Sequence, residues 1–94
     1  MFKPYRVELL EADGKTYTWT IRCGKLGRND LGQCCYRTRT ITIVPQLDEV
    51  DTLGVLAHEV FHGSCPELVE EAALRFEHNW LAVFRPLFEQ MEVF

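Results

Sequence analysis

The alternation of hydrophobic and polar positions in the first half of the chain predicts β-strands. Residues 5–10 alternate between apolar and polar side chains, and Asp13-Gly14 is a strong signal for a hairpin turn after them. Residues 16–23 alternate more strictly, with threonine or arginine on one side and bulky apolar residues on the other. This pattern is typical of an antiparallel sheet that packs one face against a core.

A third strand is expected at residues 36–44, with Ile41 and Ile43 facing inward and Pro45 ending the strand. The segment between residues 24 and 32 is rich in glycine and contains Asn29-Asp30, which indicates a loop. The first half therefore predicts a small antiparallel three-stranded sheet.

The second half of the chain has the periodicity of two helices. The first helix begins after Asp48 as N-cap and ends at Gly63, a natural C-terminal cap. The second helix is expected at residues 66–84, because Pro86 should kink or end it, and a short last helix at 87–93 follows.

The first predicted helix contains His58-Glu59-Val60-Phe61-His62, an H-E-x-x-H motif. Residues four apart are separated by about 40° around a helix axis, so both imidazoles leave the same face one turn apart. Two histidines in this arrangement suit one Zn²⁺ ion, and Glu59 lies beside them as the general base. The motif predicts zinc bound by His58 and His62 with Glu59 as the catalytic residue.

A catalytic zinc usually takes a third protein ligand and leaves its fourth position open. The candidates that follow the motif are Cys65, Glu67, Glu70, Glu71, Glu77 and His78. On a helical projection, the apolar residues of the second helix, Trp80 among them, form one stripe expected to face the sheet and the first helix. Glu70 and Glu77 flank that stripe, and Glu70 is nearer the turn between the helices. Glu70 is therefore the preferred third ligand, with a surface ion pair as its alternative role.

Composition and charge narrow the class of protein. The chain has 94 residues and a net charge of −4, which favours one domain over residues 1–94 and disfavours nucleic-acid binding. It has no apolar run of the roughly 20 residues that a membrane span needs, and its first residues lack the apolar stretch of a signal peptide. We therefore expect a cytoplasmic protein, with four reduced cysteines and a monomeric state.

A resemblance to a known group of proteins extends this interpretation. Gly32, Ile41-Thr42-Ile43, Asp51-Thr52-Leu53 and His58–Gly63 resemble small phage and bacterial zinc-peptidase-like proteins, near the ImmA/IrrE group and the minimal gluzincins. Residues 66–73 are similar to the acidic helix that completes the site in those families. On that alignment, Glu70 falls on the ligand position.

The resemblance covers about residues 32–84 and implies a zincin-like minimal core. This is an α+β fold in which a small sheet precedes an active-site helix and a glutamate-bearing helix. It also implies that the strand at 38–44 borders the cleft, where a peptide could add as a further strand. The metzincin continuation is absent, because no histidine follows His62 before His78.

The leading hypothesis is a zinc metallopeptidase that hydrolyses a protein or peptide substrate in the cytoplasm of a bacterium or of a phage-infected cell. One alternative is a catalytically silent, metal-binding module that holds a protein partner. Another is a structural zinc site closed by Cys65, and a third is a non-metal domain in which the motif is accidental. His78 and Arg39 are the candidates for stabilising the oxyanion.

Overall fold

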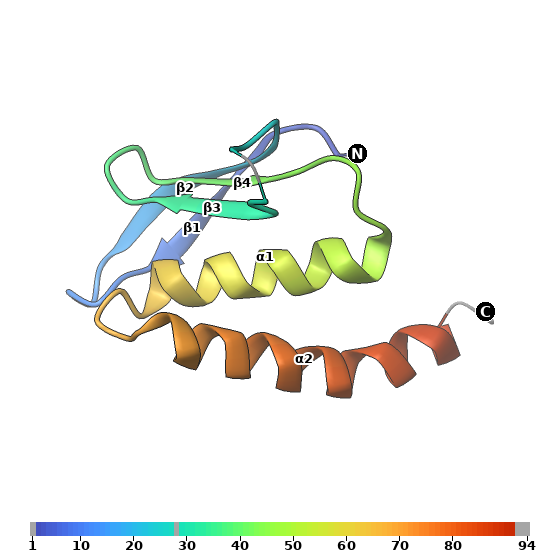
Figure 1. The fold of residues 1–94 in the computed structure, drawn as a ribbon. Coiled ribbons are helices and arrows are strands. Elements are labelled where there is room, and N and C mark those ends of the chain that lie inside the picture. The colour runs from blue at the N-terminus through green and yellow to red at the C-terminus, as the bar shows by residue number, and fades with distance from the viewer. Residues whose placement is uncertain (1, 28, 92–94) are drawn as a thin grey trace.

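The computed structural model describes residues 2–27 and 29–91, which contain four strands and two helices. Their bounds are β1 Tyr5–Leu10, β2 Thr16–Cys23, β3 Gly32–Cys35, β4 Thr40–Ile43, α1 Glu49–Ser64 and α2 Glu70–Met91. The sheet, α1 and α2 form three successive layers, with α1 in the middle (Figure 1). The expected α+β class is therefore correct.

The first hairpin agrees with the sequence pattern. β1 pairs with β2 in antiparallel register, from Tyr5 opposite Ile21 to Leu10 opposite Thr16. The turn between them needs a residue at positive φ, and Gly14 supplies it at 81°. Because glycine has no Cβ, it adopts this conformation without strain.

The sheet differs from the expected three antiparallel strands. It has four strands in the order β1-β2-β4-β3, and β2 pairs with β4 in parallel. The predicted strand at 36–44 is a turn followed by β4, because the N–H of Arg39 donates to the carbonyl of Tyr36 at 3.2 Å and Arg39 adopts a φ of 49°. β3 lies partly where a loop was expected, since four residues that include a glycine carry too little alternation to predict a strand.

The core lies between the sheet and α1. Its buried members are Trp19, Ile21, Ile41, Ile43 and Val55. The inward orientation predicted for the two isoleucines of β4 is therefore confirmed. Burial of each of these large side chains contributes about 1.5–3 kcal/mol, so this one cluster supplies much of the stability of the sheet and α1.

The ends of α1 agree with the predicted caps to within two residues. The side chain of Asp48 accepts a hydrogen bond from the N–H of Asp51 at 2.7 Å, which confirms Asp48 as the N-cap. The helix continues through Gly63 to Ser64, and Cys65 is the C-cap. Gly63 is buried next to Trp19 inside the helix, so the prediction that it is the C-terminal cap is wrong.

α2 begins four residues later than predicted and does not end at Pro86. Residues 66–68 form a turn, in which the N–H of Leu68 donates to the carbonyl of Cys65 at 3.1 Å. One helix then runs from Glu70 through Pro86 to Met91. Phe84 and Phe88, one on each side of Pro86, stack on each other with ring centroids 5.6 Å apart, so the helical spacing of side chains continues past the proline. The last part of the predicted 87–93 helix lies outside the described residues.

The side of α2 that packs matches the predicted one only in part. α2 packs on α1, and α1 in turn packs on β3 and β4. Ala73 is fully buried, and Leu81 lies against Gly54 of α1, where a Cβ would be only 2.8 Å from Leu81 Cδ1. Trp80 remains 40% exposed, so its prediction as a core residue is wrong. The packed side overlaps the predicted stripe at Ala73 and at Phe76, which stacks on Phe61 of α1, and it also includes Leu81 and Glu77.

Hydropathy separates the two helices from membrane-spanning segments. In residues 2–27 and 29–91, neither helix combines the length and the apolar character that crossing a membrane requires.

Candidate metal centre

Two histidines leave the same face of α1, as their spacing predicts. The Nε2 atoms of His58 and His62 lie 3.1 Å apart, and the two rings meet edge to face with centroids 4.8 Å apart. His58 is 8% exposed, because α2 covers it. The helix thus points two imidazole nitrogens at one location.

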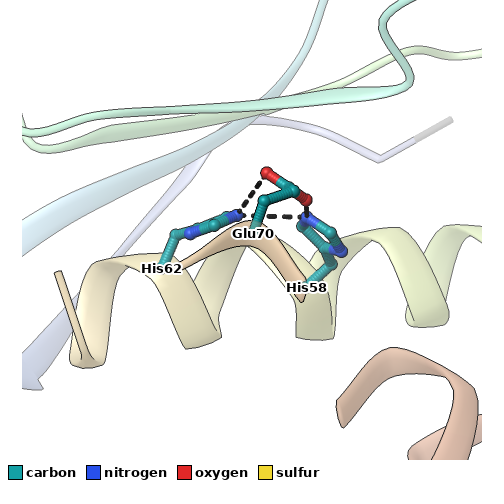
Figure 2. A group of neighbouring side chains, drawn as sticks. All are labelled: His58, His62 and Glu70. Atoms are coloured by element: carbon teal, nitrogen blue, oxygen red, sulfur yellow. Dashed lines mark hydrogen bonds and ion pairs between the residues drawn. The ribbon is translucent and has the colours of Figure 1, made fainter. Parts of the chain in front are cut away.

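Glu70, the first residue of α2, completes the group. The turn after Cys65 reverses the chain, and Figure 2 shows the Glu70 carboxylate reaching over both imidazoles. Its Oε1 lies 2.7 Å from Nε2 of His58, and its Oε2 lies 3.2 Å from Nε2 of His62. The Glu70 side chain is 60% exposed, so the group opens to solvent on one side.

These three residues fit a zinc ion by donor type and by spacing. Zinc binds histidine nitrogen and carboxylate oxygen at about 2.0–2.2 Å, so neighbouring ligand atoms of a tetrahedral site lie about 3.3 Å apart. The two Nε2 atoms lie 3.1 Å apart, one Glu70 oxygen lies near each of them, and one ligand atom from each of the three residues lies within 4.8 Å of the others. In the described part of the chain, His58, His62 and Glu70 are the group of metal-ligating side chains that converges in this way. Three protein ligands with an open side are typical of a catalytic zinc site.

A second carboxylate of α2 contacts the other side of the His58 ring. Oε1 of Glu77 lies 2.8 Å from Nδ1 of His58. Glu77 is partly buried between the helices, whereas Glu70 stands at their open end. The sequence placed Glu77 among the possible ligands, but its contact is with the nitrogen that faces away from the metal group.

Glu59 lies next to the histidines and points toward β3. It is 8% exposed, and burial raises the pKa of its carboxyl group. An ideal Cβ on Gly32 would lie 3.0 Å from Oε2 of Glu59 and 2.6 Å from Cγ1 of Val55. The missing side chain at position 32 therefore makes the space that the Glu59 carboxylate occupies, a role that the sequence pattern did not signal.

A hollow of about 440 Å³ connects these groups. Its lining includes Gly32, His58, Glu59, Glu70, Leu74 and Glu77. Two of the three metal-ligating candidates, the candidate base and Gly32 of β3 therefore line one cleft, which a substrate could enter from the solvent side.

The remaining candidates lie in other surroundings. Cys65 caps α1 through its backbone N–H, which donates to the carbonyl of Phe61 at 2.9 Å. Glu67 and Glu71 are exposed, and His78 lines a separate hollow with Arg85 and Pro86. All four cysteines are free.

Arg39 is engaged by a different set of residues. Its Nε lies 2.7 Å from Oε2 of Glu11, and its guanidinium stacks over the ring of Tyr17. Glu11 also accepts from the indole N–H of Trp19 at 2.8 Å. Arg39 therefore joins the two turns at one end of the sheet, and no described contact brings it to Glu59.

The strand that borders the cleft is β3 and not the segment at 38–44 that the resemblance implies. β4 lies between β2 and β3, so its backbone groups are paired on both sides. β3 is the edge strand. The carbonyl of Leu31 accepts from the N–H of Val44 at 3.0 Å, so by alternation the N–H and C=O groups of Gly32 and Cys34 point to the open edge.

Comparison of the chain with protein-family models, with curated proteins and with solved structures found no match. The arguments for its function therefore depend on its own residues and their geometry.

Proposed function

We propose that this protein is a zinc-dependent peptidase with a zincin-like minimal core, in which His58, His62 and Glu70 hold the metal and Glu59 is the general base. The observation that carries the proposal is the convergence of His58, His62 and Glu70, whose ligand atoms, one from each residue, all lie within 4.8 Å of one another. Such a set supports metal binding better than a chance surface cluster does, because two of its members come from one helix face at the required spacing.

Zinc held by these residues would supply a Lewis acid and would lower the pKa of a bound water toward about 7. The chain itself supplies the base. Glu59 is adjacent to His58 on α1, and its Oε2 faces the cleft beside Gly32. In the proposed reaction Glu59 takes a proton from the attacking water and delivers it to the nitrogen of the leaving amine. Its raised pKa suits a group that must both accept and release a proton.

The open edge of β3 supports a peptide as the substrate. An extended peptide could pair with the free N–H and C=O groups of Gly32 and Cys34, which would fix its backbone along the cleft. Gly32 lies against Glu59, so a peptide on this edge would pass beside the proposed base. We therefore expect an extended peptide as substrate, with main-chain hydrogen bonds as its principal anchor.

The test compares the wild-type chain with Glu59→Gln. We expect about one zinc ion per chain in both proteins, because the three ligands are unchanged. Hydrolysis of an unbiased peptide mixture, followed by mass spectrometry, should be abolished only in the variant. Glu67→Gln, at an exposed carboxylate on the turn after α1, is the matched control.

Two results would contradict the proposal. If the wild-type chain stays folded but does not bind zinc, the metal site is disproved; if Glu59→Gln hydrolyses peptides at the full rate, the role of Glu59 is disproved.

The alternative function is a catalytically silent metal-binding module that holds a protein partner. It is favoured by a row of exposed apolar side chains on α2: Phe76, Trp80, Val83 and Leu87. Zinc binding without hydrolysis of any peptide would support that alternative.

A further inference from the structure

His58 is held at both ring nitrogens by two carboxylates of the same helix. Nε2 lies 2.7 Å from Glu70, and Nδ1 lies 2.8 Å from Glu77. Glu70 and Glu77 are seven residues apart, which is close to two helical turns, so both leave the same face of α2. They are separated by about 10 Å along the axis, and the imidazole ring of His58 occupies the gap between them.

Glu77 lies on the packed side of α2 in an unfavourable position for a carboxylate. Its side chain is 28% exposed, beside the fully buried Ala73 and facing α1. An apolar residue there would pack against α1 without desolvating a charge. The rotation of α2 leaves Trp80 partly exposed while Glu77 faces α1, so packing alone does not explain this arrangement.

A carboxylate at Nδ1 has a defined effect on a neutral histidine. A carboxylate only accepts, and one carboxylate lies at each ring nitrogen of His58, so a neutral ring can donate its single hydrogen to only one of them. When Nε2 gives its lone pair to a metal, the hydrogen is on Nδ1 and Glu77 accepts it. Nε2 is the nitrogen that faces His62 and Glu70. The same hydrogen bond also fixes the rotation of the ring.

We propose that Glu77 is a positioning residue, which orients His58 and holds it in the tautomer whose Nε2 is free to bind the metal. This inference rests on the proposed metal site, but it does not depend on whether the protein hydrolyses peptides. Loss of such a partner typically weakens metal affinity 10- to 100-fold.

The experiment compares the full wild-type chain with two variants at position 77 and one control variant at position 89. Glu77→Leu removes the acceptor and puts an apolar side chain of similar size in its place. Glu77→Gln keeps an acceptor oxygen. Glu89→Leu removes an exposed carboxylate farther along the same helix and controls for the change in charge. Zinc affinity is measured by competition with a chromogenic chelator, and unfolding of the zinc-free proteins by urea.

We expect Glu77→Leu to bind zinc 10- to 100-fold more weakly while the zinc-free protein is at least as stable as the wild type. Glu77→Gln should recover most of the affinity, and Glu89→Leu should leave it unchanged. Opposite effects on affinity and stability separate positioning from packing, because a residue that only packs would change both in the same direction.

The ring itself provides a second readout. Glu70→Ala leaves Glu77 as the carboxylate in contact with the His58 ring. Long-range ¹H–¹⁵N correlation spectra of this zinc-free variant should show the hydrogen of His58 on Nδ1. When Glu77→Leu is added to it, the hydrogen should move to Nε2. The proposal is overturned if Glu77→Leu binds zinc as tightly as the wild type, or if the His58 tautomer does not change. Zinc binding without peptide hydrolysis would leave this proposal standing and would contradict only the proposed reaction. A wild-type chain that binds no zinc would overturn both.

Discussion

The absence of a side chain at Gly32 is the structural feature whose removal should affect the site most directly. In Gly32→Ala the new Cβ would lie 2.6 Å from Cγ1 of Val55 and 3.0 Å from both Cγ and Oε2 of Glu59. Val55 is 7% exposed and β-branched, so its side chain has little freedom to move away. The strain must be relieved by displacing Glu59 or by separating β3 from α1.

The expected change in the free energy of unfolding of Gly32→Ala follows from two opposing effects. Overpacking of a core position typically costs about 1–3 kcal/mol. Replacing glycine by alanine where the backbone allows it restores about 0.4–1 kcal/mol through the unfolded chain. We expect a net loss of about 1–2 kcal/mol in the free energy of unfolding. Zinc content should be unchanged, since the three atoms nearest to the new methyl group belong to Val55 and Glu59 and not to a proposed ligand. Because an error of about 1 Å in a catalytic group can cost 100-fold in rate, hydrolysis should fall by at least tenfold.

Gly27→Ala is the matched control. An ideal Cβ there meets only Oδ2 of Asp30 at 3.7 Å, an ordinary contact, so this variant reports the effect on the unfolded chain alone. Urea unfolding of both variants measures stability, and the peptide mixture described above measures hydrolysis. The reasoning is refuted if Gly32→Ala matches Gly27→Ala in unfolding midpoint. The stability arm remains informative even if no peptide is cleaved.

Two further predictions concern the parts that support the site. In Gly54→Ala, the Cβ would meet three carbons of Leu81 at 2.8–3.1 Å, so we expect lower stability than wild type by urea unfolding. In a Leu81→Ala background the clash is gone. The same substitution should then stabilise the protein, because alanine is the better helix former by about 1 kcal/mol. If Gly54→Ala also lowers stability in the Leu81→Ala background, the clash with Leu81 is not the cause. The second prediction uses Glu11, whose pKa is lowered mainly by its hydrogen bond from Arg39. A lowered pKa in the folded state gives a contribution to stability that is present above the ordinary value of 4.5 and is lost as the pH falls through the folded value. Unfolding midpoints measured from pH 7 to pH 3 should therefore decline less in Glu11→Gln than in wild type, and parallel declines would disprove the role of this pair.

The sequence was most informative where side-chain periodicity reports local structure. The first hairpin follows from alternation and from Asp13-Gly14, and α1 follows from its apolar spacing and its Asp48 cap. Both depend on contacts close in sequence. The pair His58 and His62 belongs to the same class, because a helix alone dictates how two residues four apart are oriented.

Predictions failed where the arrangement depends on contacts between distant segments. β3 lies at the edge of the sheet and β4 lies between β3 and β2, so β4 pairs with β2 in parallel. The short β3 has no alternation of apolar and polar residues that would predict this order. Glu70 is an exception: it was selected from its position beside the turn, and the structure places it with both histidines. Trp80 was assigned to the core by its apolar character. The rotation of α2, however, also reflects the close approach at Gly54 and the bond between Glu77 and His58, which no single-helix projection contains.

These same long-range contacts determine how a chain of this size can build a metal site. α2 packs on α1, and the sheet lies on the other side of α1, so α2 receives little support from the main core. Besides the packing of Phe76 on Phe61 and of Leu81 on Gly54, three contacts with the histidines hold it near the site, two from Glu70 and one from Glu77. Zinc bound by one residue of α2 and two of α1 would strengthen the same interface that brings its ligands together. Metal binding and docking of α2 are therefore coupled by geometry.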